Sequence, residues 1–337
     1  MSERPVVGIT VGDPAGIGPE VVLGACLDPE VRAACEPVLI GSLERLRATA
    51  SVLRRPTTLV DVADAGFGED AISVSDVPGV PVDHPFGVVT AAAGRASYDY
   101  IVEGVRLAAE HRIAALVTAP INKQALREAG VGHQGHTELL AGLTDAPWSQ
   151  TLFVVEELRV LFLTRHMSLA DAISRVTRAE ILQALQRFSS VSRMVGLEHP
   201  VIGVQALNPH AGDGGLFGDE DDTVIAPAVE EARTLGIDAQ GPVPADSVFA
   251  LGRAGRYHVV LSLYHDIAAG VCKAIDFDGT VSITLGLPFL RFSVDHGTAF
   301  DIAGKGIATS ANMVQTILRA ADHARGAARA IDPHQGD

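Results

Sequence analysis

The feature that most constrains the fold of this chain is an alternation between short apolar runs and longer segments with helical periodicity. The apolar runs are rich in the β-branched residues that strands prefer, and they lie at residues 6–11, 37–41, 57–62 and 114–120. Helical segments separate them, at residues 20–27, 43–55 and 90–111. Strands that alternate with helices pack as a mostly parallel sheet with helices on its faces. The sequence therefore predicts an α/β fold.

The length of 337 residues predicts about two domains, because one domain typically takes ~150 residues. A break is expected near residues 125–135, and a return to the first domain near residues 270–280. We expect a first domain at 1–130 plus 275–330, which carries the C-terminal glycine-rich segment. The second domain is expected at 131–274.

Charge and cysteine content narrow the function classes. Lys plus Arg number 26 against 41 Asp plus Glu, and the resulting net charge of −15 repels nucleic acid and anionic membranes. The three cysteines contain no CxxC pair, so neither a disulfide framework nor a cysteine zinc site is expected. No stretch approaches the ~18 apolar residues of a membrane span. We expect a cytoplasmic protein that binds neither nucleic acid nor membranes.

Three of the twelve histidines share a context, because His166, His210 and His265 each follow an apolar strand-like run. Ligand sites gather at the carboxyl ends of parallel strands. Their spacing matches no local metal motif, and an isolated histidine is more often a satisfied polar residue than a ligand. If the three imidazoles meet, they suit zinc or a similar divalent ion with an open coordination position.

A few groups are suited to an anionic ligand. Lys273 and Arg291 flank the apolar segment 280–290 and form a natural phosphate clamp, although both are also readable as solvated surface charges. In the segment GHTE, His136 and Thr137 open a short apolar helix, where free backbone amides meet anions. Thr137 is alternatively only a helix cap.

Two glycine-rich segments lack a standard nucleotide motif. GDPAGIGPE, residues 12–20, follows the first strand but is neither a GxGxxG fingerprint nor a P-loop. It is equally readable as a structural turn or as a segment near a ligand. VDHGTAFDIAGKGIA, residues 294–308, combines charged residues with two glycine turns before a helix.

Together these segments resemble a known family. GDPAGIGPE, VTAPINK, GHTE, LNPHAGDGG, YHD, ITLGLPF and DHGTAFDIAGKG occur in this order over most of the chain. They resemble the 4-hydroxythreonine-4-phosphate dehydrogenase family of vitamin B6 biosynthesis. The segment HGTAFDIAGKGIA also resembles the adenosine-binding loop of isocitrate and isopropylmalate dehydrogenases. The resemblance implies their fold, with two α/β/α domains and an active site in the interdomain cleft.

The resemblance also implies roles for individual residues. His166, His210 and His265 correspond to the ligands of a catalytic divalent metal (Zn, Mg or Co), with His265 supplied across a homodimer interface to a shared active site. Substrate contacts correspond to His136, Thr137, Lys273, Ser282 and Arg291. Contacts to NAD, with NADP as an alternative, correspond to Asp295, His296, Gly297, Thr298, Asp301 and Gly304.

The reaction implied is NAD-dependent oxidation of the C3 hydroxyl of 4-phosphooxy-L-threonine. The product decarboxylates to 3-amino-1-hydroxyacetone phosphate, a step of pyridoxal phosphate biosynthesis. Three departures bear on the substrate: Ile267 replaces an amide side chain, Ser282 stands where many members have Asn, and Phe292 stands where Thr is usual. Alternatives are an erythronate or threonate 4-phosphate dehydrogenase, a dihydrodiol dehydrogenase, or a non-catalytic phosphometabolite-binding protein.

Overall fold

The computed structural model describes residues 4–54, 57–65, 71–133 and 135–331, and the chain forms two compact units. Unit 1 comprises Met1–Ser149 and Leu287–Arg325, and unit 2 comprises Gln150–Gly286 with the end of the chain from Gly326. The sequence placed the two crossings near residues 130 and 275, whereas the units divide at 149/150 and 286/287. The difference arises because strand 281–285 pairs with strand 150–155, so both belong to unit 2.

The sheet of unit 1 is parallel, as the alternation predicts. Its strands, in spatial order, are β3 (Leu59–Asp61), β4 (Ile72–Asp76), β2 (Glu36–Gly41), β1 (Val6–Thr10), β5 (Ala115–Thr118) and β12 (Arg291–Ser293). The central strands are buried on both faces, as parallel strands between helices must be. Ile9, Leu39 and Leu116 are each 0% exposed.

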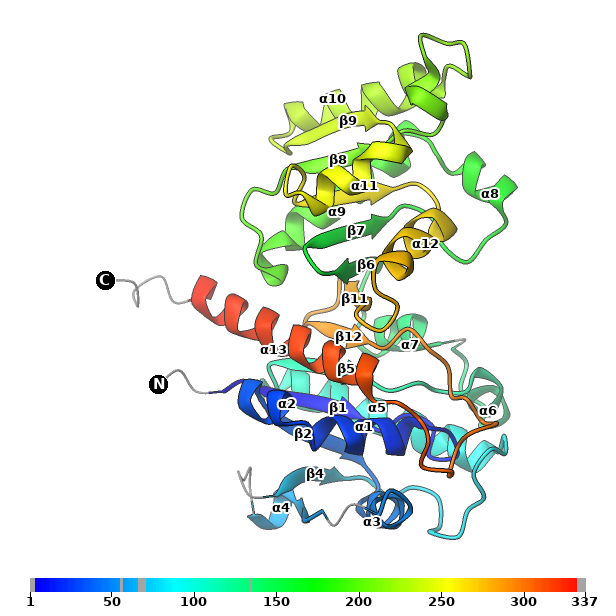
Figure 1. Ribbon diagram of the computed structural model, residues 1–337, viewed down its shortest axis with the longest axis vertical. Coiled ribbons are helices and arrows are strands. Elements are labelled where there is room, and N and C mark those ends of the chain that lie inside the picture. The colour runs from blue at the N-terminus through cyan, green and yellow to red at the C-terminus, as the bar shows by residue number, and fades with distance from the viewer. Residues whose placement is uncertain (1–3, 55–56, 66–70, 134, 332–337) are drawn as a thin grey trace. The chain divides into compact units, whose positions relative to one another are not determined.

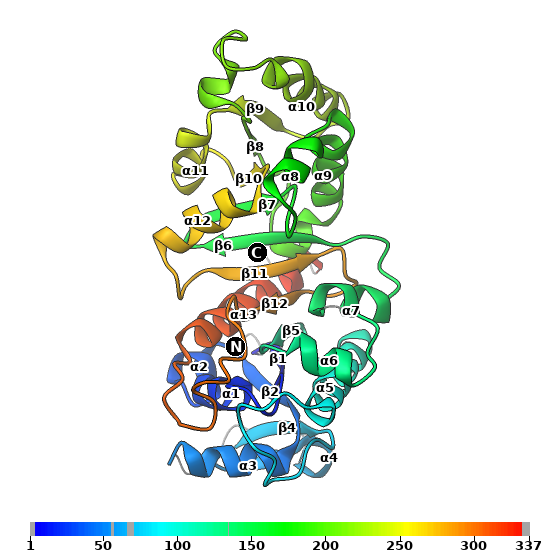
Figure 2. The same cartoon turned by 90° about the vertical axis from the view of Figure 1, so that its right-hand side faces the viewer.

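The helices of unit 1 lie on both sides of this sheet, with α1, α2 and α13 on one side and α5, α6 and α7 on the other (Figure 2). Their bounds are α1 (Gly18–Cys26), α2 (Pro29–Ala34), α3 (Leu43–Val52), α4 (Val62–Ala65), α5 (Ala91–Ala109), α6 (Lys123–Glu128), α7 (His136–Leu143) and α13 (Ala311–Ile331). The predicted helix at 90–111 is confirmed as α5, whose N-cap Thr90 accepts a hydrogen bond from the Ala93 amide.

The sheet of unit 2 is mixed. Its spatial order is β11 (Val281–Leu285), β6 (Gln150–Val155), β7 (Leu158–Phe162), β10 (Val259–Ser262), β8 (Ile202–Gln205) and β9 (Ala239–Val243). The pairings β11–β6 and β6–β7 are antiparallel, which confirms the predicted hairpin before His166. The strands from β7 to β9 are parallel.

Helices cover both faces of the unit 2 sheet, with α11 and α12 on one side and α9 and α10 on the other (Figures 1 and 2). Their bounds are α8 (Leu169–Ser174), α9 (Arg178–Val191), α10 (Ala226–Thr234), α11 (Ala245–Arg253) and α12 (His265–Ile275), with short helical turns η1 (Ser192–Val195), η2 (Pro209–Gly212) and η3 (Asp221–Ile225). A core cluster joins β6, β7 and β10 to α11 and α12 through residues such as Phe153, Phe162 and Phe249.

Local signals in the sequence place α9 correctly. Thr177 caps the helix by accepting a hydrogen bond from the Glu180 amide at 3.3 Å. Ile181, Leu185 and Phe188 are each 0% exposed, as their helical spacing predicts. Within the described residues, every helix is too short or too polar to cross a membrane.

Candidate functional site

Three neighbouring strands of unit 1 end at one edge of its sheet, and the segments that follow them carry the unit 1 part of the candidate site. β1 and β12 both pair in parallel with β5, so their carboxyl ends lie together. The segments that follow are residues 11–17 after β1, 119–122 after β5 and 294–310 after β12. In open parallel sheets, ligands bind outside the carboxyl ends of the strands.

The turn after β1 places a buried carboxylate at this edge. Gly12 has φ +73°, and a Cβ added there would lie 2.4 Å from the Pro120 carbonyl oxygen, so only glycine allows this approach to the segment after β5. Asp13 is 0% exposed, and one of its oxygens accepts a hydrogen bond from the Ala15 amide at 2.8 Å. Its other oxygen is buried without a hydrogen bond among the described residues. Burial raises the pKa of Asp13 to about 6, although the Ala15 amide and Arg45 oppose this effect.

The segment after β12 packs on this turn, and Figure 2 shows it beside α1. The Ile17 amide donates to the Thr298 carbonyl at 3.0 Å. A Cβ at Gly16 would lie 3.0 Å from atoms of Thr298, so the two backbones lie close together. Gly304 has φ +78° and lies against the Phe86 ring, where an added Cβ would be 2.5 Å away. The long loop is therefore held in a defined conformation although it contains neither helix nor strand.

The residues predicted to contact NAD all lie on this loop. Gly297 and Asp301 are exposed, whereas Asp295, His296, Thr298 and Gly304 are partly buried. The Asp295 amide donates to the Asn312 side chain at 3.2 Å, and the His296 ring contacts the Gly297 carbonyl at 3.1 Å. A Cβ atom added at Gly297 would have no described atom within 4 Å, so the backbone there is open to its surroundings. Carboxylates, an imidazole and open backbone are groups that suit the hydroxyls and the ring of a nucleoside.

His136 and Arg291 lie close together in unit 1. The Arg291 guanidinium is buried at 4% exposure and donates to the Thr118 hydroxyl at 2.7 Å. The Nε2 atom of His136 is buried and has no hydrogen-bond partner among the described residues. Burial, together with nearby Arg291, holds the pKa of His136 well below its usual value, so the imidazole is neutral at pH 7. Because Gly135 occupies the N-cap position of α7, Thr137 is not the cap of this helix.

The three strand-end histidines lie at one edge of the unit 2 sheet. His166 follows β7, His265 follows β10 and His210 follows β8, and these strands are parallel neighbours. The rings of His166 and His265 are brought together, with centroids 5.5 Å apart. His265 also contacts the Asp266 carboxylate at 2.8 Å, which orients its ring.

His210 lies on the loop that follows β8. It lies in η2 with φ 54°, followed by Ala211 at φ 55°, and its ring contacts Phe217 at a centroid distance of 6.4 Å. Buried Asp221 holds the start of this loop by accepting hydrogen bonds from the Leu207 and Asn208 amides at 2.8 and 3.0 Å. No group of three or more His, Cys, Asp or Glu side chains that could hold a metal ion occurs among the described residues.

The other predicted substrate residues of unit 2 are separated along the fold. Lys273 lies in the third turn of α12, and its ammonium is 5.3 Å from the Phe277 ring centroid. Ser282 lies within β11, opposite Phe153 of β6. Ile267 lies in the first turn of α12 close to His265, and its side chain is 40% exposed.

Phe292 does not bear on substrate choice in the way that the sequence suggested. It is 0% exposed, and its ring packs on His323 of α13 at a centroid distance of 5.4 Å. Successive strand residues point to opposite faces, so Phe292 faces away from the side on which Arg291 lies. Its replacement of threonine is a change in the core.

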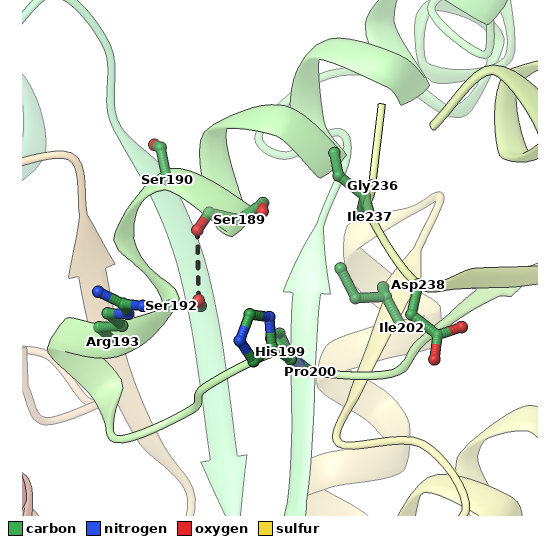
Figure 3. A pocket seen from close by; sticks show the side chains of 10 residues that line it. All are labelled: Ser189, Ser190, Ser192, Arg193, His199, Pro200, Ile202, Gly236, Ile237 and Asp238. Atoms are coloured by element: carbon green, nitrogen blue, oxygen red, sulfur yellow. Dashed lines mark hydrogen bonds between the residues drawn. The ribbon is translucent and has the colours of Figure 1, made fainter. Parts of the chain in front are cut away.

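A pocket of about 340 Å³ in unit 2 lies away from these groups. Figure 3 shows it lined by Ser189, Arg193, His199 and Ile237, with the Ser192 hydroxyl bonded to the Ser189 carbonyl. These residues lie near the amino end of β8, the edge opposite to that of the three histidines. The pocket is therefore not part of the candidate site.

Sequence reasoning left some of the site residues unassigned. Asp13, Glu20 and Thr118 lie in the segments GDPAGIGPE and VTAPINK, but their roles depend on which distant segments they contact. Thr118 contacts Arg291, and Glu20 contacts the loop after β12. The sequence signal that points to Asp13 and Glu20 is a glycine-rich segment, GDPAGIGPE, that contains one carboxylate near its start and another at its end.

Comparison with known proteins identifies the family. A model of the family "PdxA: Pyridoxal phosphate biosynthetic protein PdxA" matches residues 33–320. Proteins of Halalkalibacterium halodurans and Clostridium botulinum (strain Hall) are 44% and 42% identical over 328 and 327 residues, which is 96% of this chain and 98% of each relative. Both carry the name "Putative D-threonate 4-phosphate dehydrogenase".

A crystal structure of 4-hydroxythreonine-4-phosphate dehydrogenase from Klebsiella pneumoniae is 37% identical with a TM-score of 0.89, covering 95% of this chain and 100% of that one. These likenesses confirm the resemblance, the α/β fold and the enzyme class expected from the sequence. The chain is an oxidoreductase and belongs to the PdxA family.

Proposed function

We propose that this protein is an NAD-dependent dehydrogenase of a phosphorylated four-carbon hydroxy acid, with D-threonate 4-phosphate as its substrate. The observation that carries the proposal is the shared name of two relatives that are 42% and 44% identical over nearly the whole chain. The erythronate epimer is a close alternative. The sequence motifs favour 4-phosphooxy-L-threonine, with erythronate or threonate 4-phosphate as the alternative. The names of the relatives favour threonate 4-phosphate instead.

The environment of Arg291 supports a phosphate-bearing substrate. A buried guanidinium is worth most where it binds an oxyanion, because a planar fork of donors matches a phosphate. His136 is neutral, so it accepts or donates one hydrogen bond without adding charge. We propose that these two side chains bind the substrate's anionic group, with Thr137 and the amides at the start of α7 beside them.

The residues of unit 2 support a substrate without an amino group. An ammonium group requires hydrogen-bond acceptors, and Ile267 offers none where the resemblance leads one to expect an amide. Ser282 offers one small hydroxyl in place of a larger amide. A four-carbon acid with a hydroxyl at C2 needs fewer acceptors than the amino acid. 4-Phosphooxy-L-threonine stays a second candidate because the Klebsiella structure carries the name of that activity.

The proposed reaction oxidises the C3 hydroxyl and then releases carbon dioxide. The C3 hydrogen leaves as hydride and the hydroxyl loses a proton, which gives a 3-keto acid. The bond from C2 to the carboxylate then breaks, carbon dioxide leaves, and the resulting enolate takes up a proton at C2 to give dihydroxyacetone phosphate. NAD supplies the hydride acceptor when it is bound. The loop that contains Asp295, His296, Gly297, Thr298, Asp301 and Gly304 is proposed to bind its adenosine side. Arg291 and His136 orient the phosphate, so that C3 is held in one position during the hydride step.

We further propose that His166, His210 and His265 are ligands of a divalent metal whose complete set requires a second copy of the chain. The donors fit in type, since imidazoles suit zinc and related ions. The rings of His166 and His265 lie 5.5 Å apart within one chain, and the family resemblance, not this contact, is the reason to propose that His265 completes the site of the partner in a homodimer. A bound ion would polarise the substrate's C3 oxygen. Metal content measured against the dimer–monomer equilibrium tests this: a monomer that retains full metal affinity contradicts it.

A substrate panel tests the function. NADH formation is followed with D-threonate 4-phosphate, D-erythronate 4-phosphate and 4-phosphooxy-L-threonine at equal concentrations, each with NAD and with NADP. We expect the highest kcat/KM for D-threonate 4-phosphate with NAD, and loss of turnover with a chelator. A preference for the amino acid would return the assignment to the second candidate, and no turnover of any compound would reject a dehydrogenase of this substrate class.

Arg291→Ala tests the phosphate contact. Removing a charge-assisted, buried contact to the substrate typically costs about 2–4 kcal/mol, so KM should rise about thirtyfold or more with a smaller change in kcat. Arg291→Lys keeps the charge but loses the fork and should recover part of the loss. The matched control is Arg253→Ala, which removes an exposed arginine bonded to Glu156. An unchanged KM in folded Arg291→Ala would remove this residue from the substrate site.

A further inference from the structure

Glu20 makes a contact that no local signal in the sequence predicts. It lies in the first turn of α1 and is 2% exposed. One carboxylate oxygen accepts a hydrogen bond from the Gly304 amide at 2.5 Å, and the other accepts one from the Gly306 amide at 2.9 Å. A single buried side chain thus satisfies two backbone donors of the loop after β12, nearly three hundred residues away in sequence.

Both ends of this contact are suited to hold a loop in place. α1 is a rigid base, because Val21, Val22 and Leu23, which follow Glu20, are each 0% exposed. The donors belong to glycines with φ +78° and +66°, conformations that other residues rarely adopt. A carboxylate that accepts two amides forms charge-assisted bonds, which are stronger than neutral ones. Glu20 therefore helps to fix the conformation of residues 304–306 from outside the loop.

A purely structural role would not require a carboxylate at this point. Water satisfies exposed loop amides at little cost, and residues 305–307 are exposed, whereas the two bonds from the Gly304 and Gly306 amides to Glu20 are partly buried. Burying a carboxylate costs free energy unless it is well hydrogen-bonded. The buried Glu20 carboxylate therefore holds a loop whose residues 305–307 are exposed. Such an arrangement is expected where the conformation of the backbone matters to a ligand.

We propose that Glu20 is a positioning residue for the cofactor: it holds the backbone at 304–306 in the conformation that binds the adenosine side of NAD. The inference rests on the proposed function, which assigns this loop to NAD. It gives the GDPAGIGPE segment a task. The start of the segment shapes the edge of the sheet through Gly12 and Asp13, and its last residue fixes the loop that faces the nucleotide.

The test compares Glu20→Gln with Glu44→Gln in the full-length protein. Both changes replace a glutamate near the start of a helix in unit 1, but Glu44 is exposed and lies in the first turn of α3. ADP-ribose carries the adenosine side of NAD without nicotinamide, so calorimetric titration with it reports this half of the site. In Glu20→Gln, the side-chain oxygen can accept a hydrogen bond from only one of the two backbone amides, and the side-chain NH₂ group repels the other amide. We expect the Kd for ADP-ribose and the KM for NAD to rise about tenfold or more in Glu20→Gln.

Three readouts separate positioning from folding. At saturating NAD, kcat and the KM of the phosphorylated substrate should stay within about twofold of the unmodified protein, and Glu44→Gln should match it throughout. Hydrogen exchange of the segment 301–306 should be faster in Glu20→Gln without ligand. Glu20→Asp keeps the charge with a shorter reach and should bind ADP-ribose with intermediate affinity; it replaces Glu20→Gln as the deciding variant if the latter does not fold.

The outcomes distinguish this inference from the proposed function. If the unmodified protein binds ADP-ribose and turns over NAD, and the folded Glu20 variants do the same with unchanged constants, the positioning role is wrong and the function stands. If the unmodified protein binds neither ADP-ribose nor NAD, the assignment of the loop to NAD fails, and the role of Glu20 fails with it. If substrate KM rises as much as NAD KM, the effect of Glu20 is general and the inference is also rejected.

Discussion

Replacing His210 by alanine is expected to lower kcat by about a thousandfold or more while the protein remains folded. The side chain is proposed as a metal ligand, and removing one of three ligands removes the ion's action on the reacting oxygen, an effect of several kcal/mol. The fold should tolerate the change, because the loop that carries His210 is held by other groups. Asp221 accepts hydrogen bonds from the Leu207 and Asn208 amides, and His210 is exposed.

His199→Ala is the matched control for this experiment. His199 is also exposed and also has a left-handed backbone, with φ 48° against 54° for His210, so the two changes carry the same conformational cost. It lies at the opposite edge of the unit 2 sheet. Metal content, circular dichroism and kcat are measured for both variants. Full turnover in a folded His210→Ala protein would contradict the ligand assignment, and equal loss in both variants would point to a general effect on the unit.

Asp13→Asn is expected to stabilise the protein at pH 8 by up to about 3 kcal/mol. The pKa of Asp13 rises from its usual 3.8 to about 6, chiefly because the carboxyl is buried, so its ionised form is disfavoured in the fold. The native state therefore binds more protons than the unfolded state between about pH 4 and pH 6, and stability falls as pH rises through this window. The difference between 3.8 and about 6 corresponds to about 3 kcal/mol above pH 6. Asparagine keeps an oxygen for the Ala15 amide and carries no charge.

Denaturant midpoints at pH 5 and pH 8 measure this effect. The gain from Asp13→Asn should be larger at pH 8, and the variant should lose part of the pH dependence of the unmodified protein. Asp64→Asn, which removes an exposed carboxylate of the same unit, should change neither. An equal midpoint shift at both values would contradict the assigned titration. If turnover falls while stability rises, the buried carboxylate serves the reaction at a cost in stability, which is typical of functional groups.

Local patterns in this chain predicted its elements well because they depend on neighbouring residues. The period of apolar residues distinguishes strand from helix, and Thr90 and Thr177 mark helix starts through bonds that span three residues. Strand ends were also predictable, since apolar runs end where polar residues begin. For this reason the sequence alone placed His166, His210 and His265 at carboxyl ends of strands.

Only the tertiary structure decided which of these ends meet. Pairing of strand 281–285 with strand 150–155 moved the unit boundaries, because register between distant strands depends on side-chain packing across the sheet and is not encoded in either strand alone. The pairing of β7 with β10 brought the rings of His166 and His265 together.

The sequence by itself determined the fold class and the family, and it placed the three histidines that are proposed as metal ligands after strands. The structure decided what those residues contact. Because Phe292 is next to Arg291, the sequence suggests that it bears on the substrate. Successive strand residues point to opposite faces, and Phe292 packs in the core against His323. Glu20 looked like the end of a glycine turn, but it holds Gly304 and Gly306. Both facts depend on long-range packing and hydrogen bonds, which form only when the whole unit has folded.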